Sequence, residues 1–331
     1  MGFQQVGITD IDLESYKPHL KSWLAKNFHG EMGYMARNSE MRCHPEQLVP
    51  GTLRVICLRM DYACSKENSF IPIENSNKAY VSRYARGRDY HKLIRKRLQT
   101  LAEKIESVAG PSGYRAFVDS APVLERALAE KAGLGWIGKN TMLINKQAGS
   151  WFFLAELFTD LPLPTDQPEQ DHCGSCRACL DICPTQAFIK PNLLDATKCI
   201  SYLTIESKSA IPVELRDKIG NRIFGCDDCQ LVCPWNKFTR LTEEDDFSPR
   251  HSLDNADLID LFNWSEHDFM VKTQGSAIRR TGYEGWLRNL AVALGNATSS
   301  PEIITALVSK ENHPSALVRE HVNWALEKQR L

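Results

Sequence analysis

The stretch I-F-G-C-D-D-C-Q-L-V-C-P-W-N (223–236) decides the fold of the middle of this chain, because it holds three closely spaced cysteines and a proline: Cys226, Cys229, Cys233 and Pro234. An earlier run, C-G-S-C-R-A-C-L-D-I-C-P (173–184), has the fuller pattern C-x2-C-x2-C-x3-C-P. This spacing is typical of two-cluster 4Fe–4S ferredoxins, in which the fourth cysteine binds the other cluster. Zinc is the alternative, but zinc sites usually pair two C-x2-C knuckles and do not repeat C-x3-C-P. The two runs therefore predict an iron–sulfur module.

The second run is one cysteine short, because Ile223 stands where its first ligand would fall. Cys199, in D-A-T-K-C-I-S-Y-L (195–203), lies between the runs and can supply the missing ligand. If the fourth cysteines cross over as in ferredoxins, two sets of four are complete. The expected ligands are Cys173, Cys176, Cys179 and Cys233 for the first cluster, and Cys183, Cys199, Cys226 and Cys229 for the second. Of the three cysteines left over, Cys43, Cys57 and Cys64, we expect Cys57 to be buried within a strand.

Length and composition indicate an ordinary globular protein of two or three domains, with 331 residues and a formal net charge of -1. This charge excludes a globally basic nucleic-acid binder but leaves a local basic face open. No apolar stretch approaches the roughly 20 residues that span a bilayer, and the N-terminus does not resemble a signal peptide. We therefore expect a cytoplasmic protein, whose clustered cysteines bind metal rather than form disulfides.

Residues 1 to about 165 have the pattern of a mixed α/β domain. Branched apolar residues predict strands over 53–60 and 115–119. Apolar residues at helical spacing, bounded by proline and glycine, predict helices over 89–105 and 122–133. The proline-rich and acidic segment 160–171 indicates a linker to the cysteine-rich part.

The C-terminal part is expected to be helical. Two similar amphipathic segments, 285–297 and 316–327, each have an early arginine and a late Ala-Leu pair. The repetition favours a truncated repeat of the HEAT type. An ordinary helical hairpin that caps the neighbouring domain is the alternative.

The first domain contains none of the common nucleotide or cobalamin motifs, namely G-x-G-x-x-G, G-x4-G-K-S/T and D-x-H-x-x-G. Asp119 follows a predicted strand, where active-site acids often lie, but the residues alone favour a helix cap by Asp119 or Ser120. The basic run R-Y-A-R-G-R-D-Y-H-K-L-I-R-K-R-L (83–98) is either a solvated helix face or a phosphate-contacting surface.

Taken together, several stretches closely resemble the epoxyqueuosine reductase family over nearly the whole chain. They are V-S-R-Y-A-R-G-R-D-Y-H-K (81–92), V-D-S-A-P-V-L-E-R-A-L-A-E-K-A-G-L-G-W-I-G-K-N (118–140), the two cysteine runs and K-C-I-S-Y-L-T (198–204). The resemblance implies an oxidoreductase that reduces epoxyqueuosine to queuosine at the tRNA wobble position, the final step of queuosine biosynthesis. The implied cofactors are two 4Fe–4S clusters and a cobalamin bound base-off, without a protein histidine as lower ligand.

The resemblance also implies an α+β architecture in three parts. These are a mixed α/β cobalamin-binding catalytic domain (1–165), a ferredoxin-like module with the two clusters (166–245) and a helical HEAT-like tail (246–331). Asp119 matches the family's proton donor, and we expect burial beside an apolar corrin to raise its pKa. The residues implied to lie at or near the cobalamin are Arg42, Ser82, Asp119, Asn140, Leu143, Leu154, Ser201 and Asp227.

The implied partners are a tRNA that carries epoxyqueuosine in its anticodon loop and an external one-electron donor of the flavodoxin or ferredoxin type. Candidate tRNA contacts are Lys208, Arg216, Lys218, Arg222, Arg279, Arg280, Arg288 and Arg319. Solvated surface charge is the alternative for each, and Arg288 and Arg319 can instead hold the tail helices together. We expect a monomer. The competing functions are a reductive dehalogenase acting on a small molecule and a ferredoxin-like electron carrier without catalysis.

Overall fold

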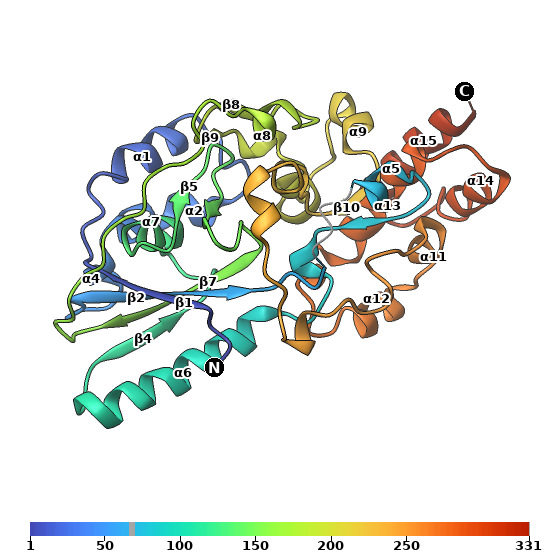
Figure 1. Ribbon diagram of the computed structural model, residues 1–331. Coiled ribbons are helices and arrows are strands. Elements are labelled where there is room, and N and C mark those ends of the chain that lie inside the picture. Colours follow the sequence, from blue (N-terminus) through green and yellow to red (C-terminus); the bar gives the residue numbers. More distant parts are fainter. Residues whose placement is uncertain (66–69, 331) are drawn as a thin grey trace.

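A four-stranded antiparallel sheet forms the centre of the N-terminal half, in the order β1-β2-β7-β4. The computed structural model describes residues 1–65 and 70–330 (Figure 1). The strands are β1 (Gln5–Thr9), β2 (Arg54–Asp61), β4 (Tyr114–Phe117) and β7 (Phe152–Thr159). The strand predicted over 53–60 is thus confirmed, and the one predicted over 115–119 begins and ends slightly earlier, as β4.

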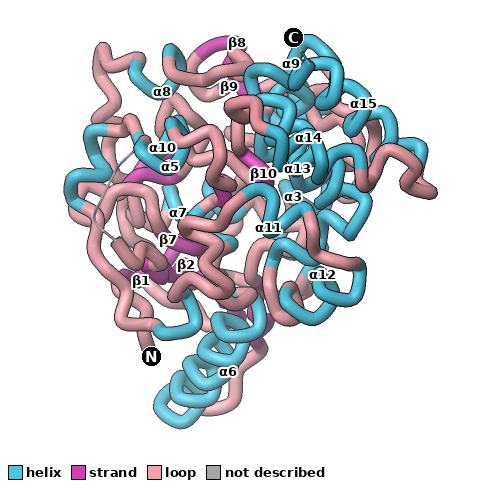
Figure 2. The backbone as a smooth tube through the Cα atoms, turned by 90° about the vertical axis from the view of Figure 1, so that its right-hand side faces the viewer, coloured by secondary structure: helices cyan, strands magenta, loops and turns pink. Residues whose placement is uncertain are grey.

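The two central strands are nearly continuous apolar runs because helices cover both faces of the sheet. Helix α6 (Tyr90–Ala109) packs Ile94 and Leu98 against one face, and α7 (Glu125–Lys131) packs Leu128 against the other. Figure 2 shows that α6 projects from the bottom of the molecule, below α12. Both helices were expected from the sequence. However, α7 begins three residues later than predicted, and among the described residues no side chain caps it. The helix-cap interpretation of Asp119 and Ser120 is therefore wrong.

Short helices and strands complete the N-terminal half. They are α1 (Lys17–Ala25), α2 (Gly33–Arg37), α3 (Ser39–Cys43), α4 (Pro45–Leu48), α5 (Ile71–Glu74), β3 (Tyr80–Val81), β5 (Trp136–Ile137) and β6 (Leu143–Ile144). Cys57, in the middle of β2, is fully buried as expected. None of the helices in the described part of the chain has the length and apolar character needed to cross a membrane.

The cysteine-rich part is built of short elements joined by tight loops. They are α8 (Ala178–Asp181), β8 (Phe188–Lys190), β9 (Leu193–Leu194), α9 (Val213–Ile219), β10 (Arg222–Phe224) and α10 (Asp228–Leu231). Strand β10 pairs in parallel with β3 and so joins this part to the N-terminal half. The next residue, Gly225, has a φ of 72°, and a Cβ there would stand 2.5 Å from the Cβ of Ser82. Glycine is required because the two backbones approach so closely.

The C-terminal part consists of α11 (Leu258–Phe262), α12 (Glu266–Lys272), α13 (Gly282–Asn296), α14 (Pro301–Val308) and α15 (Ala316–Arg330). In Figure 1 these helices lie at the opposite end of the molecule from the sheet. Helix α13 is buried on all sides, since every residue from Gly285 to Gly295 is buried. Its hydrophobic core also includes Val81 and Phe224. The tail therefore shares one core with the β3–β10 pair and is not an independent appendage.

Arg288 on α13 shows how tightly the tail is joined to the cysteine-rich part. Its guanidinium is fully buried and donates to the carbonyl oxygens of Leu203 (2.6 Å), Ser207 (2.9 Å) and Ser209 (2.8 Å). Burial lowers the pKa of Arg288 to about 10, so it remains charged at neutral pH. One side chain thus satisfies three backbone acceptors of the segment that follows Cys199.

We expect Arg288→Met to destabilise the protein by about 2–5 kcal/mol, because it leaves buried carbonyl oxygens without a donor. Thermal unfolding of the anaerobically purified protein measures the effect as a lower midpoint temperature. The control is Lys218→Met, since Lys218 is exposed on α9, and its midpoint should be unchanged. Equal midpoints for the two variants would contradict the role assigned to Arg288.

Candidate active site and cluster-binding module

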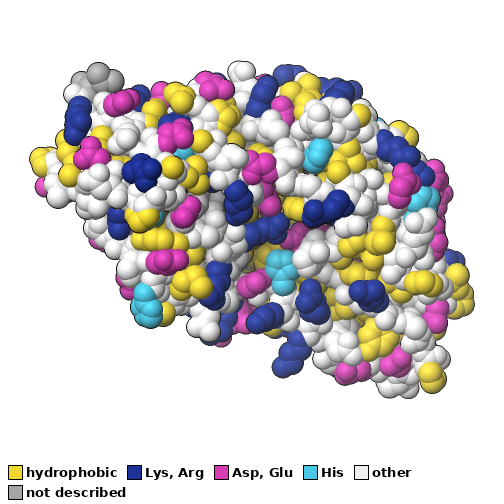
Figure 3. Space-filling model, turned by 180° about the vertical axis from the view of Figure 1, so that it is seen from behind, with side chains coloured by type: hydrophobic (Ala, Val, Ile, Leu, Met, Phe, Trp, Pro, Cys, Tyr) yellow, Lys and Arg dark blue, Asp and Glu magenta, His cyan; other side chains and the backbone are white. Residues whose placement is uncertain are grey.

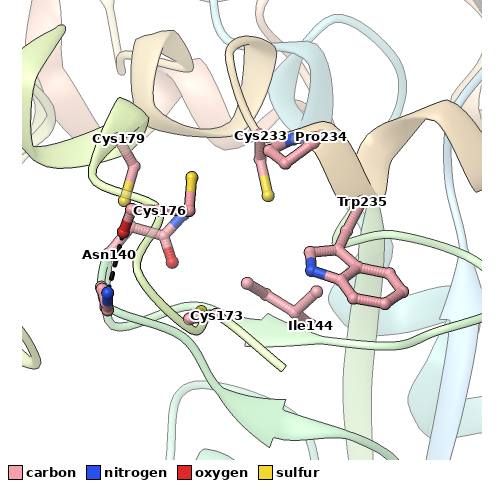
Figure 4. A pocket seen from close by; sticks show the side chains of 9 residues that line it. Asn140, Ile144, Cys173, Cys176, Cys179, Cys233, Pro234 and Trp235 are labelled. Atoms are coloured by element: carbon pink, nitrogen blue, oxygen red, sulfur yellow. Dashed lines mark hydrogen bonds between the residues drawn. The ribbon is translucent and has the colours of Figure 1, made fainter. Parts of the chain in front are cut away.

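Four cysteines from both runs line one cavity. They are Cys173, Cys176, Cys179 and Cys233, and the other lining residues are Lys139, Asn140, Ile144, Pro234 and Trp235 (Figure 4). Cys233 belongs to the second run, so the crossover expected from the ferredoxin pattern is present in the fold. The indole N–H of Trp136 donates to the sulfur of Cys173 at 3.4 Å. Such hydrogen bonds to cluster sulfurs help to set reduction potentials. These residues fit the first 4Fe–4S cluster.

The other four cysteines, Cys183, Cys199, Cys226 and Cys229, also gather in one place. Burial and then the neighbouring charge of Cys199 raise the pKa of the Cys229 thiol, and Cys179 and Cys183 are close enough to contribute. Cys199 and Cys226 pack against the same group of buried apolar side chains. The backbone N–H of Ala187 donates to the sulfur of Cys183 at 3.4 Å. The second set therefore fits a second cluster, beside the first.

Among the described residues, no three His, Cys, Asp or Glu side chains meet closely enough to hold a single metal ion. In a cluster each thiolate binds a different iron, so its ligands stand farther apart than the ligands of one zinc ion. These buried thiols would lose their protons when a cluster binds, because only the thiolate coordinates metal.

Asp227 joins the second cysteine set to the N-terminal half. Its carboxylate accepts hydrogen bonds from the Tyr80 hydroxyl (2.8 Å), the Ser82 hydroxyl and the backbone N–H of Arg83 (2.8 Å). Ser82 and Asp227, two of the residues expected near cobalamin, are thus bonded to each other. Ser201, a third, immediately precedes a π-helical segment, Tyr202–Glu206. Such irregular turns are frequent at functional sites.

Asp119 lies two residues beyond β4 in a left-handed conformation, with a φ of 52°. Its carboxylate accepts a hydrogen bond from the Tyr90 hydroxyl at 2.5 Å, and the Nε2 of His91 lies 3.4 Å away. The Nδ1 of His91 is 2.6 Å from the carboxylate of Asp89. The Asp-Tyr-His sequence at the start of α6 therefore converges on the acid expected to be the proton donor. Positive φ at a non-glycine residue often marks a functional site.

The proton of this group resides on His91. Burial lowers the pKa of His91, but its hydrogen bonds with Asp119 and Asp89 outweigh burial and raise the pKa to about 9. Burial raises the pKa of Asp119, but hydrogen bonds from His91 and Tyr90 outweigh it, and the pKa is lowered. The expectation of a raised pKa for Asp119 is therefore wrong for this arrangement. Although protein groups crowd around it, the Asp119 side chain keeps 53% of its exposure, so a substrate can reach it.

Aromatic and cationic side chains surround Asp119. Burial, and then the nearby charges of Asp119 and Asp227, raise the pKa of Tyr84. Arg280 contributes to the low pKa of Asp119, lies over the Tyr34 ring (5.9 Å) and pairs with Glu206 (2.9 Å). On the face seen in Figure 3, lysines and arginines border a hollow between the two ends of the molecule. The site thus combines an acid, aromatic walls and positive charge.

The remaining residues expected near cobalamin are placed less centrally. Arg42 is buried, donates to the carbonyls of Ala121 and Val123 at 3.4 Å, and has an Nε with no partner among the described residues. Leu143 and Leu154 pack in the core beneath α7. Asn140 lines the first cluster cavity, and its amide donates to the Cys229 carbonyl at 3.3 Å.

The eight cationic tRNA candidates divide by burial. Arg216, Arg222 and Arg288 are buried, and each has internal partners: Arg216 pairs with Glu320 and Arg222 with Asp228. Buried guanidinium groups have no surface to offer RNA phosphates. The five that retain exposure are Lys208, Lys218, Arg279, Arg280 and Arg319. Of these, Arg319 also donates to the carbonyls of His313 and Pro314.

Sequence reasoning missed the Tyr90–His91 pair and the hydrogen bond from the backbone N–H of Asp119 to the Glu125 carboxyl. The run 83–98 drew attention for its arginines and lysines, whereas the structure uses its Asp-Tyr-His centre. The available signal was that Asp89 and His91 stand at the N-terminus of a long amphipathic helix, where they are well placed to face a neighbouring strand end.

The comparisons with known proteins agree with this geometry. A family model described as "Epoxyqueuosine reductase QueG, DUF1730" matches residues 42–120, and one described as "4Fe-4S double cluster binding domain" matches residues 172–236. The epoxyqueuosine reductase of Pseudomonas aeruginosa is 62% identical over 99% of this chain and 91% of that relative. The Escherichia coli enzyme is 56% identical over 99% of this chain and 86% of that relative.

Solved structures agree as well. An epoxyqueuosine reductase in complex with an epoxyqueuosine-modified tRNA-Tyr stem loop superposes with a TM-score of 0.90 at 30% identity, covering 99% of this chain and 87% of that one. The Bacillus subtilis enzyme, solved with its catalytic aspartate loop swung out of the active site, gives a TM-score of 0.87 at 30% identity and the same coverage.

We expect Cys199→Ala to lose one cluster and keep the other, because the substitution removes one ligand from the second set alone. Iron and sulfide analysis of the anaerobically reconstituted protein should fall from about eight irons to about four. The control is Cys57→Ala, a buried cysteine outside both sets, which should keep about eight. If Cys199→Ala retains both clusters, the ligand assignment is wrong.

Proposed function

The chain belongs to the epoxyqueuosine reductase family, and we propose that it reduces epoxyqueuosine to queuosine at the wobble position of tRNA. The observation that carries this proposal is that Tyr84 is near enough to both Asp119 and Asp227 for their charges to add to burial in raising its pKa, and that its ring packs edge-on against Tyr90, which donates to Asp119. The proposed proton donor is therefore close to the module that holds the clusters. The relative solved with an epoxyqueuosine-modified stem loop supports tRNA as the substrate.

The reaction requires two electrons and two protons. Both C–O bonds of the epoxide break, a C=C bond forms, and the oxygen leaves as water. The clusters carry electrons one at a time. His91 holds a proton at neutral pH, Asp119 lies between it and the open side of the site, and Tyr90 steadies the carboxylate. We propose that Asp119 passes the His91 proton to the departing oxygen, as a general acid does.

We propose that a cobalamin binds between Asp119 and the second cluster. It would supply a low-valent metal centre able to deliver electrons to the epoxide carbon. The observation that fits it is the buried Nε of Arg42, which has no partner among the described residues, beside the aromatic and cationic wall around Asp119. Arg42, Ser82, Ser201 and Asp227 are placed to contact its polar groups, and Leu143 and Leu154 to pack behind it. His91 is held by Asp89 and Asp119, which supports base-off binding without this imidazole as ligand.

Five cations form the proposed tRNA surface, Lys208, Lys218, Arg279, Arg280 and Arg319. Of these, Arg280 is close enough to Asp119 for its charge to help lower the pKa of Asp119. Phosphate contacts of this kind position an RNA, while an unstacked base is the part that can enter a pocket. We further propose that the chain divides into a catalytic domain (1–165), a ferredoxin-like module (166–245) and a HEAT-like tail (246–331), and that it acts as a monomer in the cytoplasm.

Electrons must enter from an external one-electron donor, for which we propose a flavodoxin or a ferredoxin. Cys176, in the first set, is exposed, whereas Cys199, Cys226 and Cys229 of the second set are less accessible. The first cluster is therefore the better entry point, and the second is placed to pass electrons towards Asp119.

We expect Asp119→Asn to reduce turnover of epoxyqueuosine tRNA by about 10²- to 10⁴-fold, the usual contribution of a general acid. Cluster content should be unchanged, because Asp119 is not a cluster ligand, and cobalamin should still bind, because asparagine has nearly the same size and shape as aspartate. Mass spectrometry of the digested tRNA nucleosides measures the turnover. The matched control is the adjacent Ser120→Ala, which should keep most activity. Near-normal turnover in Asp119→Asn would remove Asp119 from the mechanism.

A further inference from the structure

Two glutamates lie in contact beneath Asp119. Glu156, in the middle of β7, is fully buried, with Cys57 and Phe117 opposite it on the neighbouring strands. Among the described residues, neither of its carboxyl oxygens has a hydrogen-bond donor. Its carboxyl group meets that of Glu125, the first residue of α7. The Oε1 of Glu125 accepts the backbone N–H of Asp119.

Two carboxyl groups in contact cannot both be ionised where one of them, Glu156, is fully buried and the other, Glu125, is half-buried, because like charges repel and little solvent screens them. Burial and the charge of Asp119 raise the pKa of Glu125 to about 8. Burial and the charge of Glu125 raise the pKa of Glu156 well above its usual range. The other titratable or charged groups that face the pair are Arg42, Tyr90, Arg126 and the Cys57 thiol. None of these four is hydrogen-bonded to Glu156 within the described part of the chain.

We propose that Glu125 and Glu156 hold a proton between them and that this protonated pair positions Asp119 for proton transfer. Neutral Glu156 donates its O–H to Glu125, and Glu125 in turn accepts the N–H of Asp119. The chain of two hydrogen bonds runs from the sheet to the loop that carries the catalytic acid. Glu125 and Glu156 are positioning residues, since Glu156 is fully buried and Glu125 binds the backbone N–H of Asp119. This inference rests on the proposed function of Asp119.

Asp119 needs such a support. Its left-handed φ of 52° is unfavourable for a residue with a side chain and persists only where surrounding contacts enforce it. In the Bacillus subtilis relative, the catalytic aspartate loop has been seen swung out of the active site. A loop with two positions requires a contact that selects one. The Glu125 carboxyl is such a contact, because it binds the backbone of Asp119 and leaves the side chain to Tyr90 and His91.

The first test compares two substitutions of Glu125. Glu125→Ala removes the acceptor, so turnover should fall about 10- to 100-fold, the cost of a displaced catalytic group. The KM for tRNA should stay near that of the unmodified protein. Glu125→Gln should recover most of the turnover, because its amide oxygen accepts the Asp119 N–H and its NH₂ donates to Glu156. Equal turnover in Glu125→Ala and the parent protein would overturn the proposal, as would a Gln variant no better than Ala.

The second test observes the proton itself and needs no turnover. Infrared spectra of the protein at neutral pH should contain the carbonyl band of a buried protonated carboxylic acid. Glu156→Gln should remove this band, whereas Glu103→Gln, at an exposed position on α6, should not. If the band is absent from the parent protein, or survives in Glu156→Gln, the shared proton does not exist.

The pH dependence of stability gives an independent test of the proton that Glu125 and Glu156 share. The folded state holds a proton that an unfolded glutamate releases near pH 4.3. Between that value and the raised folded pKa, the pair's contribution to stability is therefore lost as pH rises. Glu156→Gln cannot release this proton, so its thermal midpoint should fall less between about pH 6 and about pH 8. Parallel pH profiles for the two proteins would contradict the proposal.

The outcomes separate this inference from the function on which it rests. If Asp119→Asn is inactive while Glu125→Ala is fully active, Asp119 keeps its role and the glutamate pair loses the one proposed for it. If Asp119→Asn is active, the proposed proton donor fails, whereas the infrared band still reports whether Glu125 and Glu156 hold a proton.

Discussion

The buried carboxylate of Asp227 is the constraint on which the rest of the site depends. It stands between two cluster ligands in sequence, Cys226 and Cys229, and accepts hydrogen bonds from Tyr80, Ser82 and Arg83 of the N-terminal half. One side chain therefore fixes the distance between the electron-carrying module and the catalytic domain. The parallel β3–β10 pair reinforces it. Because electron transfer depends steeply on distance, a rigid connection at this point serves the function better than a flexible linker would.

The protonation state of Asp119 follows from its neighbours rather than from burial alone. An isolated carboxyl beside an apolar surface would have a raised pKa. Asp119 instead has Tyr90 and His91 as hydrogen-bond partners, and these stabilise its ionised form. The proton is kept on the imidazole of His91, whose pKa is about 9, so the Asp119–His91 pair still holds a proton at neutral pH. A pair of this kind can donate a proton without a strongly perturbed carboxyl.

The sequence was most informative where chemistry is encoded by local spacing. The ligand run at 173–184 and the place of Ile223 were enough to predict Cys199 as the missing ligand, and the fold brings it near Cys226 and Cys229. The sheet strands and helix α6 also follow from local periodicity. The contact between Asp119 and His91 does not, because it depends on how β4 and α6 pack. The contact of Glu156 could not be predicted either, because a single acid in an apolar strand does not show which side chain it meets.

The arginines show the same limit of sequence-based prediction, because the surroundings of their side chains could not be predicted. Arg222, Arg280 and Arg288 were all candidates for RNA contact from the sequence. The structure uses them differently: Arg222 is buried in an ion pair with Asp228, Arg288 satisfies three backbone carbonyls, and Arg280 stays exposed near Asp119. Whether a cation meets water, backbone or phosphate is decided by tertiary packing. The segment from Cys199 to Ser209 is therefore held by Arg288 from the tail side, and this anchoring keeps the second set of cysteines and Arg280 in fixed relation to Asp119.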